Sequence, residues 1–305
     1  MTDPGWTLLV DPESDGLRLD RFLSTRIRRL SRARASRLEV FDLDAPDRPL
    51  KKSVSVRAGQ RLWARRPVPD ADATLVAPSV IYEDEAVLVL DKPAGLAVHP
   101  TASRYRSTVT HWLASRPDSA GVEPAHRIDV ETSGVLLCGK GPSTVRALRR
   151  AFAEGAPRKA YLAVVEGLPA ADAWTADTPL GFATDSAVRI KMGRGDKPSR
   201  TDFRVRARGR ERALVEARPV TGRQHQVRVH CAMAGHPIVG DKLYGPHEAL
   251  FLAHLERALT TPEVARLGHH RQALHAWRLE VTLAGRHLAF EAPCPAAFSA
   301  LYGDE

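Results

Sequence analysis

The sequence predicts an α+β fold in two parts, a small basic segment followed by a larger domain built on a sheet. Two observations predict it. Nearly all the excess positive charge lies before residue 67, and after residue 78 the chain becomes a series of short apolar runs separated by Gly and Pro. A chain of 305 residues is long enough for one large and one small domain. We expect domains at 1–66 and 79–305, joined by a linker at 67–78.

The first segment has the pattern of two helices followed by two strands. In RLDRFLSTRIRRL (18–30) the apolar residues fall at helical spacing and leave arginines on the opposite face. SRARASRLEV (31–40) predicts a second helix, on which Arg34 and Arg37 are three residues apart and point the same way. SVSVRAGQRLWARRP (53–67) predicts two short strands that meet at Gly59.

The charge of this segment indicates a polyanionic partner. Between Leu17 and Arg66 there are 15 basic and 5 acidic residues, a surplus of 10, whereas the whole chain has a net charge of +9. Most of the basic residues are arginines, whose planar fork matches a phosphate group. We interpret the segment as a nucleic-acid-binding face; the alternative is an ordinary solvated surface.

The larger domain has the pattern of a many-stranded sheet with few helices. The helices are expected at 103–115, at 143–155 with Gly155 as its C-terminal cap, and near 250–259 in an added stretch at 246–270. The expected strands are AVLVLD (86–91), GVLLC (134–138), KAYLAVVEG (159–167), RALVEARPV (212–220) and RLEVTLAG (278–285).

Composition argues against several other classes of protein. No stretch approaches the roughly 20 apolar residues of a membrane span, and the acidic start does not resemble a secretory signal, so we expect a cytoplasmic protein with no membrane partner. Cys138, Cys231 and Cys294 are far apart without CxxC spacing, which favours reduced thiols and no metal site.

Four stretches contain more polar residues than folding alone requires. They are DKPAGLAVHP (91–100), HRIDVETSG (126–134), RKAYLAVVEG (158–167) and VTGRQHQVRVHCAMAGHPIVGDKLYG (220–245). In order and spacing they resemble the RluA-type pseudouridine synthases, which isomerise uridine to pseudouridine within folded RNA. The opening, RLDRFL followed by LSRARA, resembles the S4 RNA-binding domain. The resemblance implies a mixed, mostly antiparallel central sheet and a reaction that needs no metal, redox partner or nucleotide cofactor. We also expect a monomer.

The resemblance implies a role for each polar residue. Asp129 is the catalytic carboxylate, acting either through a covalent bond to the nucleotide or by removing a sugar proton. A buried carboxylate needs a cation to stay charged, and the resemblance assigns that ion pair to Arg223. Tyr161 lies against the flipped base, and Arg127 fills the place that the base leaves. Lys159, His225, Gln226 and Arg228 are candidates for holding phosphates or for bracing the pocket. Further candidates for contacts with RNA are His126, Arg34 and Arg37, and Leu274 is a candidate pocket wall.

A basic front module favours a structured, extended RNA, because it adds phosphate contacts, and the family resemblance implies large-subunit ribosomal RNA as the substrate. Transfer RNA is one alternative. A second alternative is a non-catalytic ribosome assembly factor with an S4 domain. Such a protein would be expected to have lost the pocket residues, whereas Asp129, Arg127, Tyr161 and Arg223 are all present. A hydrolase using His126 and Asp129 would need a nucleophile on a sharp turn, and no GxSxG is present.

Overall fold

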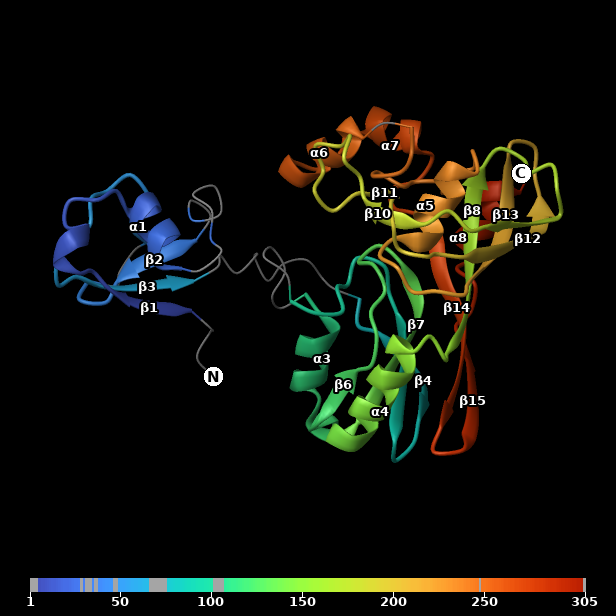
Figure 1. Cartoon of the computed structure of the whole chain (residues 1–305), viewed down its shortest axis with the longest axis horizontal. Helices are drawn as coiled ribbons and strands as arrows, with labels where there is room; N and C mark the ends of the chain where they lie inside the picture. The colour runs from blue at the N-terminus through green and yellow to red at the C-terminus, as the bar shows by residue number, and fades with distance from the viewer. Residues whose placement is uncertain are drawn as a thin grey trace. The chain divides into compact units, whose positions relative to one another are not determined.

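The computed structural model describes residues 5–27, 30, 35, 38–45, 49–65, 76–100, 107–246 and 248–303. The chain forms two compact units, one from residues 1–74 with 100–106 and the other from residues 75–99 with 107–305 (Figure 1). Residues 66–75, most of the predicted linker, lie outside the described residues. Each unit is considered by itself below.

The first unit contains a three-stranded antiparallel sheet in the order β1-β3-β2, made of β1 (Trp6–Leu9), β3 (Arg61–Arg65) and β2 (Glu39–Asp42). A short 3-10 helix, η1 (Pro12–Ser14), precedes helix α1 (Leu19–Arg26), which begins where the apolar periodicity predicts. The apolar face of α1 packs on the sheet around a fully buried Phe22. This unit therefore has a hydrophobic core of its own.

Parts of the prediction for this unit are wrong. Residues 53–57 do not form a strand and contribute only an isolated bridge between Arg18 and Ser55, whereas β1 was not expected. Glu39 and Val40 belong to strand β2 because Val40 is buried against β3, so the second helix cannot extend to residue 40. Arg34 and Arg37 lie outside the described residues. The S4-like character of the unit stays a prediction.

The second unit is built on a ten-stranded sheet, which confirms the mixed, mostly antiparallel prediction. Along its main path the strands run β4-β5-β7-β14-β8-β13-β12-β9, with β15 beside β14 and β6 beside β7. The pair β7 and β14 is parallel, and the other pairings are antiparallel. The strands are β4 (Ser79–Glu83), β5 (Val87–Lys92), β6 (Val122–Pro124), β7 (Ser133–Lys140), β8 (Arg158–Glu166), β9 (Ala173–Ala176), β12 (Thr201–Arg208), β13 (Arg212–Pro219), β14 (Leu274–Leu283) and β15 (Arg286–Glu291).

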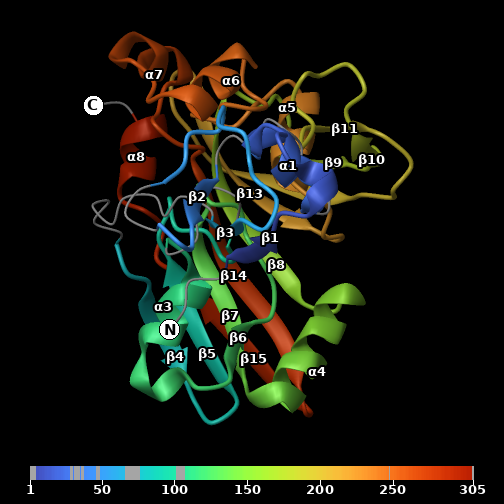
Figure 2. The same ribbon diagram turned by 90° about the vertical axis from the view of Figure 1, so that its left-hand side faces the viewer.

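Helices cover the two ends of this sheet. Helix α3 (Val109–Ser115), the 3-10 turn η2 (Pro117–Ser119) and helix α4 (Gly141–Ala153) lie at the end of β6 and β7. At the opposite end lie α5 (Gln226–Met233), α6 (Ala249–Glu256), α7 (Thr261–Leu267) and α8 (Ala297–Tyr302), together with the small hairpin β10 (Leu180–Phe182) and β11 (Met192–Arg194), as Figures 1 and 2 show. The helices expected at 143–155 and near 250–259 are therefore present; α7 was not expected.

Gly134 allows the central strands to approach closely. It has a φ of +110°, and a Cβ there would lie 2.2 Å from the carbonyl oxygen of Ala276 in β14. Ala276 is also the register partner of Tyr161 in β8. The loop that precedes β7 and carries Asp129 is thus brought over strand β8.

Among the described residues, no helix is long and apolar enough to cross a membrane.

Candidate active site

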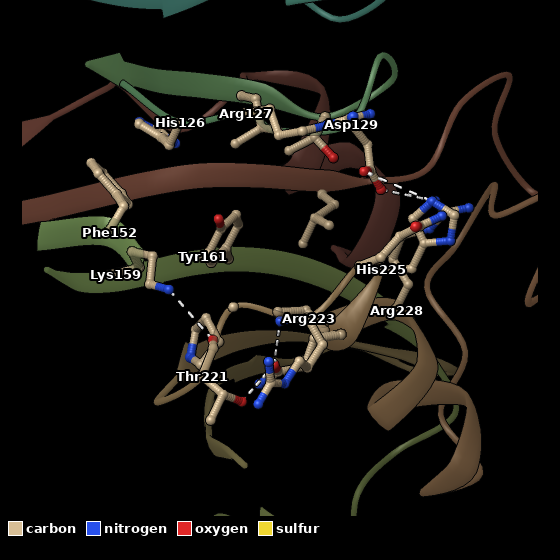
Figure 3. A pocket seen from close by; sticks show the side chains of 18 of the residues that line it. His126, Arg127, Asp129, Phe152, Lys159, Tyr161, Thr221, Arg223, His225 and Arg228 are labelled. Atoms are coloured by element: carbon tan, nitrogen blue, oxygen red, sulfur yellow. Dashed lines mark hydrogen bonds and ion pairs between the residues drawn. The ribbon is translucent and has the colours of Figure 1, made fainter. Parts of the chain in front are cut away.

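A cavity of about 470 Å³ opens where the loop before β7 faces strand β8 and the start of helix α5 (Figure 3). This volume lies within the range of pockets that hold a small ligand. Most of the predicted site residues line it, although they come from segments up to about 150 residues apart in the sequence. The lining includes His126, Arg127, Asp129, Lys159, Tyr161, Arg223, His225, Gln226, Arg228 and Leu274.

The carboxylate of Asp129 is held by Arg228. The Nη1 of Arg228 donates to Oδ2 of Asp129 at 2.9 Å, while its Nε and Nη2 donate to the two oxygens of Asp241 at 2.7 and 2.9 Å. Asp241 is fully buried and also accepts from the backbone N–H groups of Leu243 and Tyr244. One guanidinium therefore lies between two carboxylates, and Asp241 fixes its orientation.

This arrangement keeps Asp129 ionised. Burial alone would raise the pKa of Asp129, but the charge of Arg228, the electrostatic effect of His225 and hydrogen bonds from Arg228 and Gln272 together outweigh burial and lower the pKa below its usual value of 3.8. The pKa of Asp241 is lowered by Arg228 in the same way, also against burial. Asp129, whose side chain is 27% exposed, is thus a charged carboxylate on the pocket wall, and nucleophilic or basic chemistry requires the charged form.

The prediction that Arg223 makes this ion pair is wrong. The Arg223 side chain is exposed and its Nε donates to the carbonyl oxygen of Pro198 at 3.1 Å. Arg223 precedes helix α5, whereas Arg228 lies in its first turn and reaches into the pocket (Figure 3). One feature of the sequence could have indicated Arg228 as the partner. QVRVHCAM is apolar enough for a helix that is buried on most sides, and a buried arginine must be paired with a carboxylate.

Of the two predicted alternatives, contact with RNA or bracing of the pocket, the geometry of Arg228 and Gln226 favours bracing. Each of the three nitrogens of the Arg228 guanidinium donates to a carboxylate, and the residue is 7% exposed. The amide of Gln226 is equally occupied: it accepts from Thr221 and from the Arg223 backbone, and it donates to Arg200 and Thr201. The Gln226 amide therefore has no donor or acceptor left for a phosphate, and Arg228 is buried and held by two carboxylates.

Tyr161 and Leu274 form the apolar side of the cavity. Both lie on the face of the sheet that carries the pocket, Tyr161 on β8 and Leu274 at the start of β14. Burial, together with the charge of Asp129, raises the pKa of Tyr161, so its phenol keeps its proton at neutral pH. A tyrosine ring whose hydroxyl keeps its proton can stack on a base, and the hydroxyl can take part in proton transfer beside a carboxylate.

The other basic residues stand at different places around the cavity. Arg127 is exposed, two residues before Asp129. Lys159 is half-buried, and its Nζ donates to the carbonyl oxygen of Thr221 at 3.4 Å. The ring of His126 stacks on Phe152, and its Nε2 accepts from the backbone N–H of Leu137 at 3.1 Å. Burial lowers the pKa of His126 to about 3, so this ring is a neutral anchor of the loop to strand β7.

Lys92 is a further part of the site that the sequence did not reveal. It is fully buried, and its Nζ donates to the carbonyl oxygens of Pro93, Leu96 and Val130. Val130 follows Asp129 directly, so Lys92 ties the KPAG turn to the loop that carries the carboxylate. The available signal was the apolar strand VLVLDK, in which a buried lysine needs a set of acceptors.

Comparison with known proteins gives the family of the chain. The model of the RNA pseudouridylate synthase family matches residues 86–233. The ribosomal large subunit pseudouridine synthase C of Escherichia coli is 32% identical over 93% of this chain and 91% of that protein. This chain belongs to the RNA pseudouridylate synthases. It is therefore an isomerase that acts on RNA.

Further similarities agree with this family. The ribosomal large subunit pseudouridine synthase D of Nitrosomonas europaea is 31% identical over 96% of this chain and 86% of that protein. Among solved structures, human RNA pseudouridylate synthase domain containing 1 has a TM-score of 0.61 and 25% identity, over 74% of this chain and 88% of that chain. Apart from Leu274, the residues that line the pocket lie within residues 86–233, which the family model matches.

Proposed function

We propose that this synthase isomerises uridine to pseudouridine in large-subunit ribosomal RNA, with Asp129 as the catalytic carboxylate. The observation that carries the proposal is the ion pair of Asp129 with Arg228 on the wall of a cavity large enough for a nucleoside. Arg228 keeps the carboxylate charged, and Asp241 holds Arg228 in place. The names of the bacterial relatives support ribosomal RNA as the substrate class.

The residues around Asp129 support a role for each part of the nucleotide. A base must leave its stack to enter the cavity, which costs a few kcal/mol. Tyr161 receives the flipped base on its ring, and Leu274 closes the pocket behind it. Arg127, exposed beside the entrance, fills the gap left in the RNA stack. Arg223 is reassigned to the phosphate backbone, because its guanidinium is exposed at the rim.

The first unit serves as a basic RNA-binding module in this proposal. Among its described residues, α1 and β3 carry exposed arginines, and the unit has a hydrophobic core of its own. The S4-like assignment at residues 1–66, the linker at 67–78 and the catalytic domain at 79–305 are part of the proposal. So are a cytoplasmic location and a monomeric state.

The test is chemical mapping of pseudouridine in total RNA from a strain that lacks the protein. Purified protein is incubated with this RNA, and the Asp129→Asn variant is the control. We expect new pseudouridine in 23S-type ribosomal RNA with the wild type and none with the variant. New sites confined to transfer RNA would overturn the choice of substrate. Tight RNA binding without any new site would overturn catalysis and favour an assembly factor.

A further inference from the structure

His225 has an unusual backbone conformation at the pocket. Its φ of 54° and ψ of 17° lie in the left-handed region, and among the described residues only Ala284 is another non-glycine residue with positive φ. His225 is the N-cap of α5, but its side chain makes no capping hydrogen bond. The strained backbone therefore serves to direct the imidazole into the cavity beside Asp129 (Figure 3).

Tyr244 determines which nitrogen of this imidazole carries the proton. The Tyr244 hydroxyl accepts from the backbone N–H of Met192 at 2.8 Å and lies 2.8 Å from Nδ1 of His225. If Nδ1 carried the proton, the buried hydroxyl would accept two hydrogen bonds and its own hydrogen would have no acceptor among the described residues. If the hydroxyl donates to Nδ1, every group is satisfied, and the ring proton is on Nε2.

The surrounding charges keep this ring neutral. Burial, with the charges of Arg228 and Arg127, lowers the pKa of His225 to about 4, although Asp129 and Asp241 act in the opposite direction. At neutral pH the ring has therefore one N–H group. This N–H group, on Nε2, lies on the side of the ring that faces Asp129.

The distance between His225 and Asp129 fits one oxygen atom between them. Nε2 of His225 is 3.9 Å from Oδ1 of Asp129, while the hydrogen bond from Arg228 uses Oδ2. A separation of 3.9 Å is too long for a direct hydrogen bond, but one oxygen atom can lie about 2.8 Å from both. That oxygen must accept from Nε2–H and donate to the carboxylate, so it must carry a hydrogen of its own, as the oxygen of a hydroxyl group or of a water molecule does.

A nucleotide inside an RNA chain has one such group. The uracil carbonyls and the phosphate oxygens accept only, and N3–H donates only, whereas the ribose 2′-hydroxyl both donates and accepts. We propose that His225, fixed by Tyr244 with its proton on Nε2, forms with Oδ1 of Asp129 a binding site for the 2′-hydroxyl of the target uridine. This assignment rests on the function proposed above and makes His225 a residue that selects ribose over deoxyribose.

The tautomer can be tested on the free, full-length protein. Nitrogen-15 NMR of histidine-labelled protein distinguishes the two tautomers, and the His225→Gln variant identifies the signal. We expect the Nε2–H form at neutral pH, and a mixture of tautomers in Tyr244→Phe. A signal of the Nδ1–H form, or of a charged ring, in the wild type would overturn the proposal. This measurement requires no RNA.

The contact with ribose can be tested with matched RNAs. The probe is the ribosomal stem–loop identified by the mapping experiment, with uridine or 2′-deoxyuridine at the target position, under single-turnover conditions. We expect wild type to prefer the ribose form by about tenfold or more, from the loss of one hydrogen bond. His225→Met should lose most of this preference. His225→Gln, equal in length but with an amide N–H, should keep part of it.

The decisive quantity is the ratio of the rate with uridine to the rate with 2′-deoxyuridine, because a merely structural role of His225 would lower both rates equally. An unchanged ratio in His225→Met would overturn the proposal, and would indicate a water molecule between the two side chains. If 2′-deoxyuridine does not react at all, equilibrium binding of the product RNAs, with pseudouridine or 2′-deoxypseudouridine, gives the same ratio. Absence of any converted uridine would overturn both proposals, whereas an unchanged ratio leaves the isomerase function intact.

Discussion

At the scale of single residues, the site is governed by a guanidinium shared between two acids. Arg228 faces Asp129 on one side and the fully buried Asp241 on the other. Two carboxylates and one guanidinium together carry one excess negative charge. Asp129 is the carboxylate of the two that lines the cavity. Motif order singled out Asp129, but of the two arginines five residues apart in GRQHQVR the prediction chose Arg223 as its partner, whereas the structure pairs it with Arg228.

Replacing Asp129 tests the catalytic carboxylate. Asp129→Asn keeps the shape of the side chain and its contact with Arg228 but removes the charge. We expect kcat to fall by about 10⁴-fold or more, because the reacting group itself is lost. RNA binding should change little. Pseudouridine formation and filter binding on the same RNA measure the two effects, and retained turnover would contradict the assignment.

The two arginines should differ in their effect on the pH dependence. Wild-type kcat/KM should show no acidic limb above about pH 4, because the pKa of Asp129 is below its usual value of 3.8. In Arg228→Met, the strongest effect that opposes burial is lost, so the pKa of Asp129 rises and the acidic limb moves towards neutral pH. The variant should also lose about 3–5 kcal/mol of stability, because the fully buried carboxylate of Asp241 and the half-buried carboxylate of Asp129 lose their cation.

Arg223→Met is the matched control for that measurement. Its side chain contacts Pro198 and solvent, so the acidic limb should stay in place while KM rises by a few-fold through the loss of one phosphate contact, about 1 kcal/mol. A shifted acidic limb in Arg223→Met, with none in Arg228→Met, would restore the original ion-pair assignment.

At the scale of elements, the site depends on the parallel contact of β7 with β14. Ala276 has Gly134 on one side and Tyr161 on the other, so this contact sets the spacing between the loop of Asp129 and the tyrosine ring. Strand patterns in the sequence predicted β7, β8 and β14 individually. They could not predict which strands are neighbours, since pairing depends on contacts between residues more than 100 positions apart.

Gly134→Ala tests this contact, and Gly141→Ala is its control. Both glycines have positive φ, but a Cβ at Gly134 would lie 2.2 Å from the Ala276 carbonyl oxygen, whereas a Cβ at Gly141 meets nothing within 4 Å. Gly141→Ala should cost about 1–2 kcal/mol from backbone strain alone. Gly134→Ala should cost clearly more and lower kcat as well. Equal midpoints in urea unfolding would exclude the close contact as the cause.

At the scale of the whole molecule, charge and chemistry are divided between two units with separate cores. The core of the first unit surrounds Phe22, and the pocket belongs entirely to the second unit. The surplus of basic residues in 17–66 was visible in the sequence, because charge needs no folding to be counted. The strands of the first unit were predicted less well, since short edge strands such as β1 carry little periodicity.

Removal of residues 1–74 tests the division of labour. The remaining chain keeps the pocket and its surrounding core, so we expect measurable turnover on a short stem–loop. Affinity for long ribosomal RNA should fall, and the dependence of log Kd on log salt concentration should become shallower, because fewer phosphates are neutralised. An unchanged salt dependence would mean that the basic segment is a solvated surface without a role in RNA binding.

The sequence by itself indicated the family, singled out Asp129 as the candidate carboxylate and predicted strands β5, β7, β8, β13 and β14 of the larger sheet, because these follow from local motifs and from short apolar runs. Only the tertiary structure decided which arginine faces Asp129, that Lys92 and Asp241 support the site, and that Tyr244 orients His225. The physical reason is that a buried charge or hydrogen bond depends on distances between distant segments, and helix α5 directs Arg228 inward while leaving Arg223 outside.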